Sequence, residues 1–504
     1  MRPLVFCAIK FVLKKSRFHL ISLRYQGLPD KTNRKNRGNA MYQIDFKKPC
    51  HVHFIGIGGI SMSGLAEILL DEGFSVSGSD MQDSELCGHL RGLGARIVVG
   101  QRAENIGTGA DQPDVVVFTA AIHPDNPEFK AAKERGIPML SRAELLGELM
   151  TNYREAVNIA GTHGKTTTTS MLTEILLEAH RDPTVTVGGI LDAIGGNIRV
   201  GGPDCFVAEA CEYTNSFLSF YPTLSIVLNV EADHLDFFKD IDDIRHSFRE
   251  FILRLPQNER GFLVFNGDIK DPQYFREGLG CGVVTFGHGA DCDYTARDIR
   301  YDAYAHPSYT LVVRGKEEGR IELGVAGEHN VYNSLAAIAA AQRLKVSLED
   351  IRSALKKFTG TERRFEYKGE CRGFTIIDDY AHHPQEITAT LNAAKRCPHK
   401  KLWVVFQPHT YTRTKALLPE FAKALSAADA VVLADIYAAR EKNTIGISSA
   451  DLAEKIAELG TEVHYLPNFS EIEKFILKEV KPGDLLITMG AGNVVDIGNQ
   501  LLSM

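Results

Sequence analysis

N-I-A-G-T-H-G-K-T-T-T-T, residues 158–169, is the stretch of the chain that decides its fold. A short apolar run leads into a turn framed by Gly161 and Gly164, and Lys165-Thr166 then opens a helical segment. Backbone N–H groups of such a turn point at a polyphosphate, the lysine neutralises its terminal phosphates, and the threonine hydroxyl suits a bridging Mg²⁺. The spacing G-x-x-G-K-T is shorter than the usual G-x-x-x-x-G-K-[ST]. The strand before it and the helix after it nevertheless indicate a nucleotide-binding α/β domain.

Length, charge and cysteine content limit the number of domains and the classes of protein to which the chain can belong. A chain of 504 residues is too long for one hydrophobic core and indicates roughly three domains. Residues 1–40 hold ten Lys/Arg and one acid, a charge of +9, so 47 basic and 63 acidic residues leave −16 for the rest. A body this acidic is a poor general nucleic-acid binder, because nonspecific affinity comes from neutralising phosphates. The nine scattered cysteines favour reduced thiols, and hence a cytoplasmic protein, over a disulfide framework.

Residues 1–40 form a basic extension that we expect to be disordered and to lie outside the fold. Their apolar run from Leu4 to Leu13 is broken by Lys10 and is too short to span a membrane, so no stable membrane insertion is expected. The segment is either a nonessential extension, such as translated sequence upstream of Met41, or an amphipathic surface anchor.

Beyond Val52 the chain alternates strand-like and helix-like patterns, which is typical of parallel α/β architecture. We expect a Rossmann-like unit over 41–151, a central P-loop ATPase unit over 152–361 and a second Rossmann-like unit over 362–504. Apolar runs predict strands at 51–57, 74–77, 96–99, 115–119, 205–209, 224–230, 375–378, 402–406, 430–435 and 485–489. Periodic runs predict helices at 62–70, 142–150, 348–358, 384–395, 450–459 and 471–479, and a turn with an Ala-rich helix at 325–344. The Gly-rich stretches 188–202 and 278–289 are expected to be loops or hairpins.

A second Gly-rich turn, Gly56-x-Gly58-Gly59-x-Ser61, follows the first strand of the chain. It has Ser61 where the dinucleotide fingerprint has its third glycine, and Asp80 follows near the place of the ribose-binding acid. Either a pyrophosphate binds at the start of the helix, or the segment is a tight turn without a ligand.

Polar residues gather where the predicted central strands end. A-E-A-C-E (208–212) and N-V-E-A-D-H (229–234) each follow an apolar strand, and carboxylates at that edge could hold Mg²⁺ against a triphosphate. Spacing alone does not decide among Glu209, Glu212, Glu231 and Asp233, and it leaves His234 as a metal ligand or a helix cap. Further on, E-H-N-x-x-N (328–333) puts two asparagines on one helical face, for a purine or ribose or for capping.

The last unit carries an unusual density of titratable groups. Arg363-Arg364 is followed by D-D-Y-A-H-H-P (378–384) and Q-P-H-T-Y-T-R (407–413), and both of these motifs come after apolar strands and before helices. We therefore expect them at the ligand-binding edge of a sheet.

Taken together, these motifs resemble the Mur ligase family from about His51 to the C-terminus. The segments that carry the resemblance are H-F-I-G-I-G-G-I-S-M-S-G, G-T-H-G-K-T-T-T-T, A-E-A-C-E-Y, N-V-E-A-D-H-L-D, G-E-H-N, R-R-F-E, D-D-Y-A-H-H-P and Q-P-H-T-Y-T-R-T. The resemblance implies ATP-dependent ligation of L-alanine to the carboxylate of UDP-N-acetylmuramate through an acyl phosphate, in peptidoglycan precursor synthesis. ATP and Mg²⁺ would be the cofactors, and the protein would be a monomer or a homodimer.

The resemblance also implies roles for individual residues. The expected catalytic residues are Lys165, His382 and Arg413. The expected ATP-binding set is Gly161, Thr162, His163, Gly164, Lys165, Thr166, Thr167, Asn330 and Arg364. Gly58, Ser79 and Asp80 would bind the UDP-sugar; Tyr380, His382 and Arg413 the amino acid; and Thr166, Glu212 and His234 the metal.

Departures from the family pattern refine these expectations. Thr410 stands where many relatives have Arg, so contacts to the alanine carboxylate would rest more on Arg413. The segment 241–251 contains none of the lysines that sibling ligases carbamylate, which favours the alanine-adding branch. Two alternatives remain: a recycling ligase that joins a preformed peptide to UDP-N-acetylmuramate, and a non-catalytic sensor of ATP and UDP-sugar.

Overall fold

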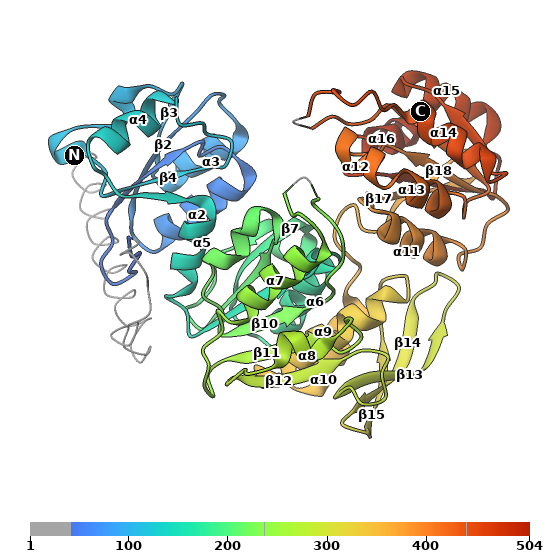
Figure 1. Cartoon of the computed structure of the whole chain (residues 1–504), viewed down its shortest axis with the longest axis horizontal. Coiled ribbons are helices and arrows are strands. Elements are labelled where there is room, and N and C mark those ends of the chain that lie inside the picture. The colour runs from blue at the N-terminus through green and yellow to red at the C-terminus, as the bar shows by residue number, and fades with distance from the viewer. Residues whose placement is uncertain (1–41, 236, 440) are drawn as a thin grey trace, which may run out of the picture.

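The computed structural model describes residues 42–235, 237–439 and 441–504, so the predictions for residues 1–40 lie outside the described part of the chain. It contains three α/β units, with the first and last on opposite sides of the central one (Figure 1). The predicted fold class is confirmed. None of the helices in the described ranges has the length and apolar character needed to cross a membrane.

The first unit is a five-stranded parallel sheet in the order β3-β2-β1-β4-β5. Its strands are β1 (His51–Ile55), β2 (Ser75–Asp80), β3 (Arg96–Val99), β4 (Val115–Phe118) and β5 (Met139–Ser141). Its helices are α2 (Ile60–Asp71), α3 (Glu85–Leu93), α4 (Pro127–Glu134) and α5 (Arg142–Met150). A capping box fixes the start of α5, because the Ser141 hydroxyl accepts from the Glu144 N–H and the Glu144 carboxylate accepts from the Ser141 N–H.

The central unit is built on ten strands in the order β15-β14-β13-β12-β11-β10-β6-β9-β7-β8. They are β6 (Glu155–Ala160), β7 (Thr184–Leu191), β8 (Gly196–Arg199), β9 (Cys205–Ala210), β10 (Leu224–Val227), β11 (Phe262–Asn266), β12 (Gly282–Phe286), β13 (Tyr294–Tyr301), β14 (Pro307–Val313) and β15 (Lys316–Glu322). The helical elements are α6 (Lys165–Glu178), η4 (Asp192–Ile194), η5 (Tyr213–Ser219), α7 (Ile241–Ile252), α8 (Pro272–Arg276), α9 (His329–Arg343) and α10 (Leu348–Lys357).

The third unit is a six-stranded sheet in the order β16-β17-β21-β18-β19-β20, parallel except for the β16–β17 pair. The strands are β16 (Glu366–Cys371), β17 (Phe374–Asp379), β18 (Leu402–Phe406), β19 (Ala430–Leu433), β20 (Glu462–Tyr465) and β21 (Leu485–Met489). The helices are α11 (Pro384–Ala394), α12 (Tyr411–Ala416), α13 (Leu418–Leu425), α14 (Ser449–Glu458), α15 (Phe469–Glu479) and α16 (Val495–Ser503).

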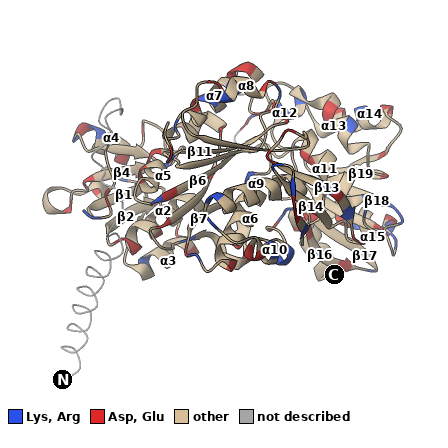
Figure 2. Cartoon of the chain, turned by 90° about the horizontal axis from the view of Figure 1, so that it is seen from below, with Lys and Arg blue, Asp and Glu red and all other residues tan. Residues whose placement is uncertain are grey.

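One hydrophobic core contains residues of both the first and the central units. The third unit has two cores of its own, and a small cluster of Ala305, Ala326 and Ala393 joins it to the central unit. The ring of Tyr153 lies 5.9 Å from that of Phe46 and 5.0 Å from that of Phe206, which joins the two units through aromatic contacts. Figure 2 shows Lys and Arg interspersed with Asp and Glu over the helices of all three units.

One local prediction is wrong. The stretch 278–289 was expected to be a loop or hairpin, but it contains β12, which pairs in parallel with β11 in the middle of the central sheet. Its apolar run Val283-Val284-Thr285-Phe286 finds a parallel neighbour there, and that burial outweighs the flanking glycines. The stretch 188–202 does include the end of a hairpin, formed by β7 and β8.

Candidate active site

The phosphate loop joins β6 to α6 in the centre of the molecule. Gly161 has φ +150° and Gly164 has φ +84°, and a Cβ on Gly164 would lie 2.6 Å from the Asn333 side-chain oxygen. Only glycine fits this backbone without strain. The turn therefore presents bare backbone at the point where α6 begins, as the sequence predicts for a phosphate-binding loop.

Lys165 is held inside this loop by an ion pair. Its Nζ lies 3.0 Å from the Glu212 carboxylate and donates to the Thr162 carbonyl at 3.0 Å, and the two side chains of the pair are only 15% and 4% exposed. Burial alone would lower the pKa of Lys165, but the Glu212 carboxylate outweighs it and raises the pKa. The lysine is therefore fully charged and the loop carries a buried cation.

Asn229, which sequence reasoning did not single out, fastens the loop to the end of β10. Its side chain accepts from the His163 N–H at 2.8 Å and donates to the His163 carbonyl at 3.1 Å. The next turn is tied in as well, because the Glu231 N–H donates to the Thr162 hydroxyl at 3.0 Å. The signal for Asn229 was its place directly after a buried strand beside the loop.

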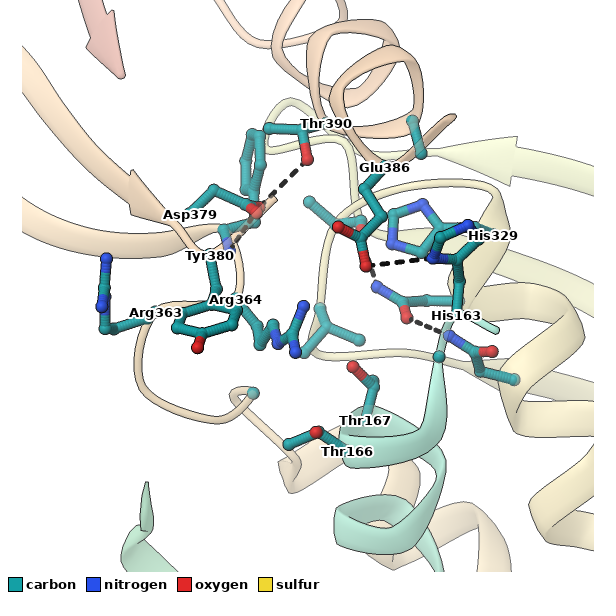
Figure 3. A pocket seen from close by; sticks show the side chains of 18 of the residues that line it. His163, Thr166, Thr167, His329, Arg363, Arg364, Asp379, Tyr380, Glu386 and Thr390 are labelled. Atoms are coloured by element: carbon teal, nitrogen blue, oxygen red, sulfur yellow. Dashed lines mark hydrogen bonds and ion pairs between the residues drawn. The ribbon is translucent and has the colours of Figure 1, made fainter. Parts of the chain in front are cut away.

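Side chains of the third unit reach the same loop (Figure 3). The His163 ring lies 3.1 Å from the Glu386 carboxylate and 3.5 Å from that of Glu231. Burial alone would lower the pKa of His163, but the two carboxylates outweigh it and raise the pKa to about 9. A second bridge joins Arg413 to Asp233 at 3.2 Å. Two charge pairs thus connect the central and third units across the site.

His382 lies in the same region, and a hydrogen bond to its ring defines the tautomer. Its Nδ1 lies 3.0 Å from the Tyr380 carbonyl, which only an Nδ1–H can satisfy, so Nε2 carries the lone pair in the neutral ring. Burial lowers the pKa of His382 to about 4, which keeps the ring neutral at physiological pH. The guanidinium of Arg364 lies 5.1 Å from the centre of the Tyr380 ring.

The two asparagines of α9 do share a face, as predicted. The Asn333 amide donates to the Asn330 side-chain oxygen at 3.0 Å, and the Asn330 amide donates to the Ala326 carbonyl at 2.7 Å. On the same turn, between the two asparagines in sequence, the Tyr332 ring stacks on His288, with 3.8 Å between centroids. This part of the site combines amide groups with an aromatic surface.

These groups surround one cavity of about 1330 Å³ between the central and third units. The predicted site residues that line it are Thr162, His163, Gly164, Lys165, Thr166, Thr167, His234, Asn330, Arg364, Tyr380 and His382. Glu212 and Arg413 reach the site through their ion pairs with Lys165 and Asp233. A cavity of this volume accommodates a nucleoside triphosphate together with a second small molecule.

Two of the predicted metal ligands, Glu212 and His234, contact other side chains. The described residues contain no group of three His, Cys, Asp or Glu side chains that could hold a metal ion. Glu212 is paired with Lys165, and the His234 ring lies tilted against the Tyr213 ring, with 4.5 Å between their centroids. The oxygen donors of Glu212 and Thr166 do suit Mg²⁺ bound mainly by phosphate oxygens and water, whereas a histidine nitrogen suits it less well.

The three residues predicted to bind the UDP-sugar lie in the first unit, away from this cavity. The Gly58 N–H donates to the Asp80 carboxylate at 2.9 Å, which closes the Gly-rich turn. The Ser79 hydroxyl is buried and donates to Glu128 at 2.7 Å, whereas the Ser79 carbonyl supports the turn by accepting from the Gly56 N–H at 2.8 Å.

All three units match domain models of one family. The matches are to "Mur ligase family, catalytic domain" over residues 51–154, "Mur ligase middle domain" over 159–341 and "Mur ligase, glutamate ligase domain" over 363–492. The chain belongs to the Mur ligase family, and the resemblance stated from its motifs is confirmed.

Individual relatives narrow the comparison. The chain is 62% identical over 463 residues to the UDP-N-acetylmuramate–L-alanine ligase of Lachnospira eligens, covering 92% of this chain and all of that protein. It is 57% identical over 462 residues to the enzyme of the same name from Agathobacter rectalis, with the same coverage. Among solved structures, the UDP-N-acetylmuramate–alanine ligase of Thermotoga maritima superposes with a TM-score of 0.72 at 30% identity, covering 90% of this chain and 98% of that one.

Proposed function

We propose that this protein joins L-alanine to the carboxylate of UDP-N-acetylmuramate, converting ATP to ADP and phosphate. The observation that carries the proposal is the single cavity in which the Lys165 loop faces Tyr380 and His382 across the domain junction. The names of the similar enzymes support it from the side of sequence.

The first step would activate the carboxylate. A carboxylate oxygen attacks the γ-phosphorus of ATP, the bond to the β-phosphate oxygen breaks, and ADP leaves with that bond's electron pair. Lys165 and the loop N–H groups would neutralise charge on the phosphates during this transfer, which depends mainly on positioning and electrostatics. On binding, a phosphate oxygen would replace part of the contact that Lys165 now makes with Glu212.

Glu212 and the Thr166 hydroxyl would then be available to Mg²⁺. When bound, the ion would add positive charge beside the transferred phosphoryl group. We propose Glu212 and Thr166 as its protein ligands and His234 as a neighbour in the outer shell. Asn330, Asn333 and the Tyr332–His288 stack would hold the nucleoside end, because amides and aromatic faces suit a purine and its ribose.

The second step would form the amide. The alanine nitrogen attacks the acyl carbon, and the tetrahedral intermediate collapses with loss of phosphate. Since Nε2 of neutral His382 carries a lone pair, it could accept the amine proton as the nitrogen loses basicity. Arg413 would pair with the alanine carboxylate, in exchange for part of its contact with Asp233.

We propose that residues 41–151 form the UDP-sugar-binding domain, 152–361 the ATP-binding domain and 362–504 the amino-acid-binding domain. The cavity lies between the last two. The sugar nucleotide would therefore enter from the first domain, with its carboxylate directed at the phosphate loop.

The decisive experiment measures phosphate release with each candidate amino acid or peptide, with and without UDP-N-acetylmuramate. Release that needs both L-alanine and the sugar nucleotide supports the proposal. Release with a preformed tripeptide in place of alanine would favour the recycling reaction. The murein peptide ligase of Psychrobacter arcticus has the same fold, with a TM-score of 0.64 at 26% identity, which makes that arm necessary. ATP binding without turnover would instead indicate a sensor.

A further inference from the structure

Arg142, the first residue of α5, is a half-buried cation for which the described residues provide no anion. Its side chain is half-buried, and no hydrogen bond or ion pair to its guanidinium occurs in the described ranges. Burial lowers its pKa, and the only titratable group acting on it in that part of the chain is the neighbouring Cys211 thiol. A guanidinium that is always charged and is withdrawn from water without a counter-ion is costly to the protein. Such a group is commonly kept to bind an anion.

Arg142 directly follows β5, and the ends of β1, β4 and β5 lie next to one another at one edge of the first sheet. In the first sheet β1, β4 and β5 are neighbours, and Phe118 of β4 is aligned with Ser141 of β5. Thr119 and Arg142 are the next residues of these two strands, and they therefore leave the sheet side by side. Gly56 is the first glycine of the turn that follows β1, and a Cβ added to it would lie 2.9 Å from the Thr119 methyl group. A ligand seated at the Gly56 turn can thus extend over Thr119 toward Arg142.

The central unit brings the phosphate loop to the other side of Arg142. Helix α5 packs tightly on η5, because a Cβ on Gly147 would collide with the Ser219 carbonyl. Cys211 and Glu212 lie immediately before η5, and Glu212 holds Lys165. Arg142 is therefore situated between the Gly-rich turn of the first unit and the cation of the ATP loop.

We propose that Arg142 binds the lactyl carboxylate of the sugar nucleotide and directs it at the phosphate loop. This inference rests on the function proposed above and names the residue that selects a muramyl over a glucosaminyl substrate. The pyrophosphate belongs at the Gly56 turn, and two strand spacings, about 10 Å, separate the ends of β1 and β5. The hexose and its lactyl ether span that gap, so the anion that reaches Arg142 is the carboxylate.

The test compares two ligands that differ in this carboxylate. UDP-N-acetylmuramate carries it and UDP-N-acetylglucosamine does not. Calorimetric titration without ATP would measure both affinities for the full-length wild type, Arg142→Met and Arg142→Lys. Arg154→Met is the matched control, because Arg154 follows α5 at the same domain junction and pairs with Asp204 on the surface.

We expect Arg142→Met to weaken UDP-N-acetylmuramate binding about 10- to 100-fold, as for loss of a charge-assisted contact. Binding of UDP-N-acetylglucosamine should stay unchanged, and Arg142→Lys should retain part of the discrimination because it keeps the charge but not the planar fork. Arg154→Met should change neither affinity. The melting temperature of Arg142→Met should not fall, since an unpaired, half-buried charge is removed, whereas a purely structural role predicts a lower melting temperature.

Two results would overturn the assignment. An equal loss for both ligands would mean that Arg142 holds the pyrophosphate, and no loss for either would mean that it does not touch the ligand. If Arg142→Met does not fold, the ratio of the two affinities for Arg142→Lys decides between these outcomes. A wild-type protein that shows no preference for UDP-N-acetylmuramate would instead refute the proposed function itself, which keeps the two failures distinct.

Discussion

Replacing Lys165 by methionine should lower both the melting temperature and the ligation rate, for two different reasons. Methionine retains most of the apolar stem but leaves the Glu212 carboxylate, 4% exposed, without its cation. Removing one partner of a buried ion pair costs about 3–5 kcal/mol. For a domain the size of the central one, each kcal/mol corresponds to about 2–4 °C, so melting should fall by roughly 10 °C. Ligation should fall at least ~10³-fold, because phosphoryl transfer loses its cation.

A second substitution separates the two effects. Adding Glu212→Gln to Lys165→Met removes the orphaned charge, so calorimetry should show most of the lost melting temperature restored while ligation stays absent. UDP-sugar binding should persist in both variants, because the Gly56 turn belongs to another domain. Lys357→Met is the control: it breaks an exposed pair with Glu178 and should cost under about 1 kcal/mol. Melting of Lys165→Met within about 2 °C of wild type would refute the reasoning.

Three further outcomes are expected. The pKa of His163 is about 9 in the folded protein, compared with 6.5 for an ordinary histidine. The pairing of His163 with Glu386 therefore stabilises the domain junction fully below pH 6.5, and this stabilisation is lost as the pH rises toward 9. Scattering should therefore show the ligand-free protein expanding over that range, and Glu386→Gln should abolish the dependence; a wild-type radius of gyration that is constant with pH would contradict it. Asn229→Ala should raise the KM for ATP about tenfold by releasing the phosphate loop, with UDP-sugar affinity as the unaffected reference. A chain starting at Met41 should match the full chain in activity and melting temperature, since it keeps every motif of the site; a loss of several degrees would show that the removed segment packs on the body.

The regular parts of the fold could be predicted because hydrophobic pattern and turn chemistry agree there. The apolar runs at 402–406 and 485–489 became β18 and β21 at the predicted limits, and α5 begins and ends where its capping serine and apolar spacing indicate. Prediction failed where signals conflict. β12 lies among glycines, and the meander β13–β15 has exposed polar faces, so only pairing with neighbouring strands reveals them.

For the site, too, some features could be predicted from the sequence and others could not. Sequence motifs indicated many of the groups that line the cavity, because the phosphate loop, residues 229–234 and residues 380–383 each follow a strand at the ligand edge of a sheet. They could not name the partners of those groups. Glu386 looks like an ordinary capping residue of α11, yet it also pairs with His163, 223 positions earlier. Nor could they show that Glu212 pairs with Lys165, since that depends on the approach of β9 to the loop.

The contacts between domains indicate how binding and closure are coupled. The linker is fastened to the central unit as far as Glu362, because the Thr361 hydroxyl bonds to Ser170 at 3.0 Å and the Glu362 N–H donates to the Ile190 carbonyl at 3.1 Å. If the third unit moves relative to the central one, the first residue free to act as a hinge is therefore Arg363, whose φ of +61° already departs from extended backbone. Beyond it, the third unit meets the loop through His163–Glu386 and Asp233–Arg413. Both pairs involve groups that would face substrate, so each ligand that binds changes the charges that hold the domains together.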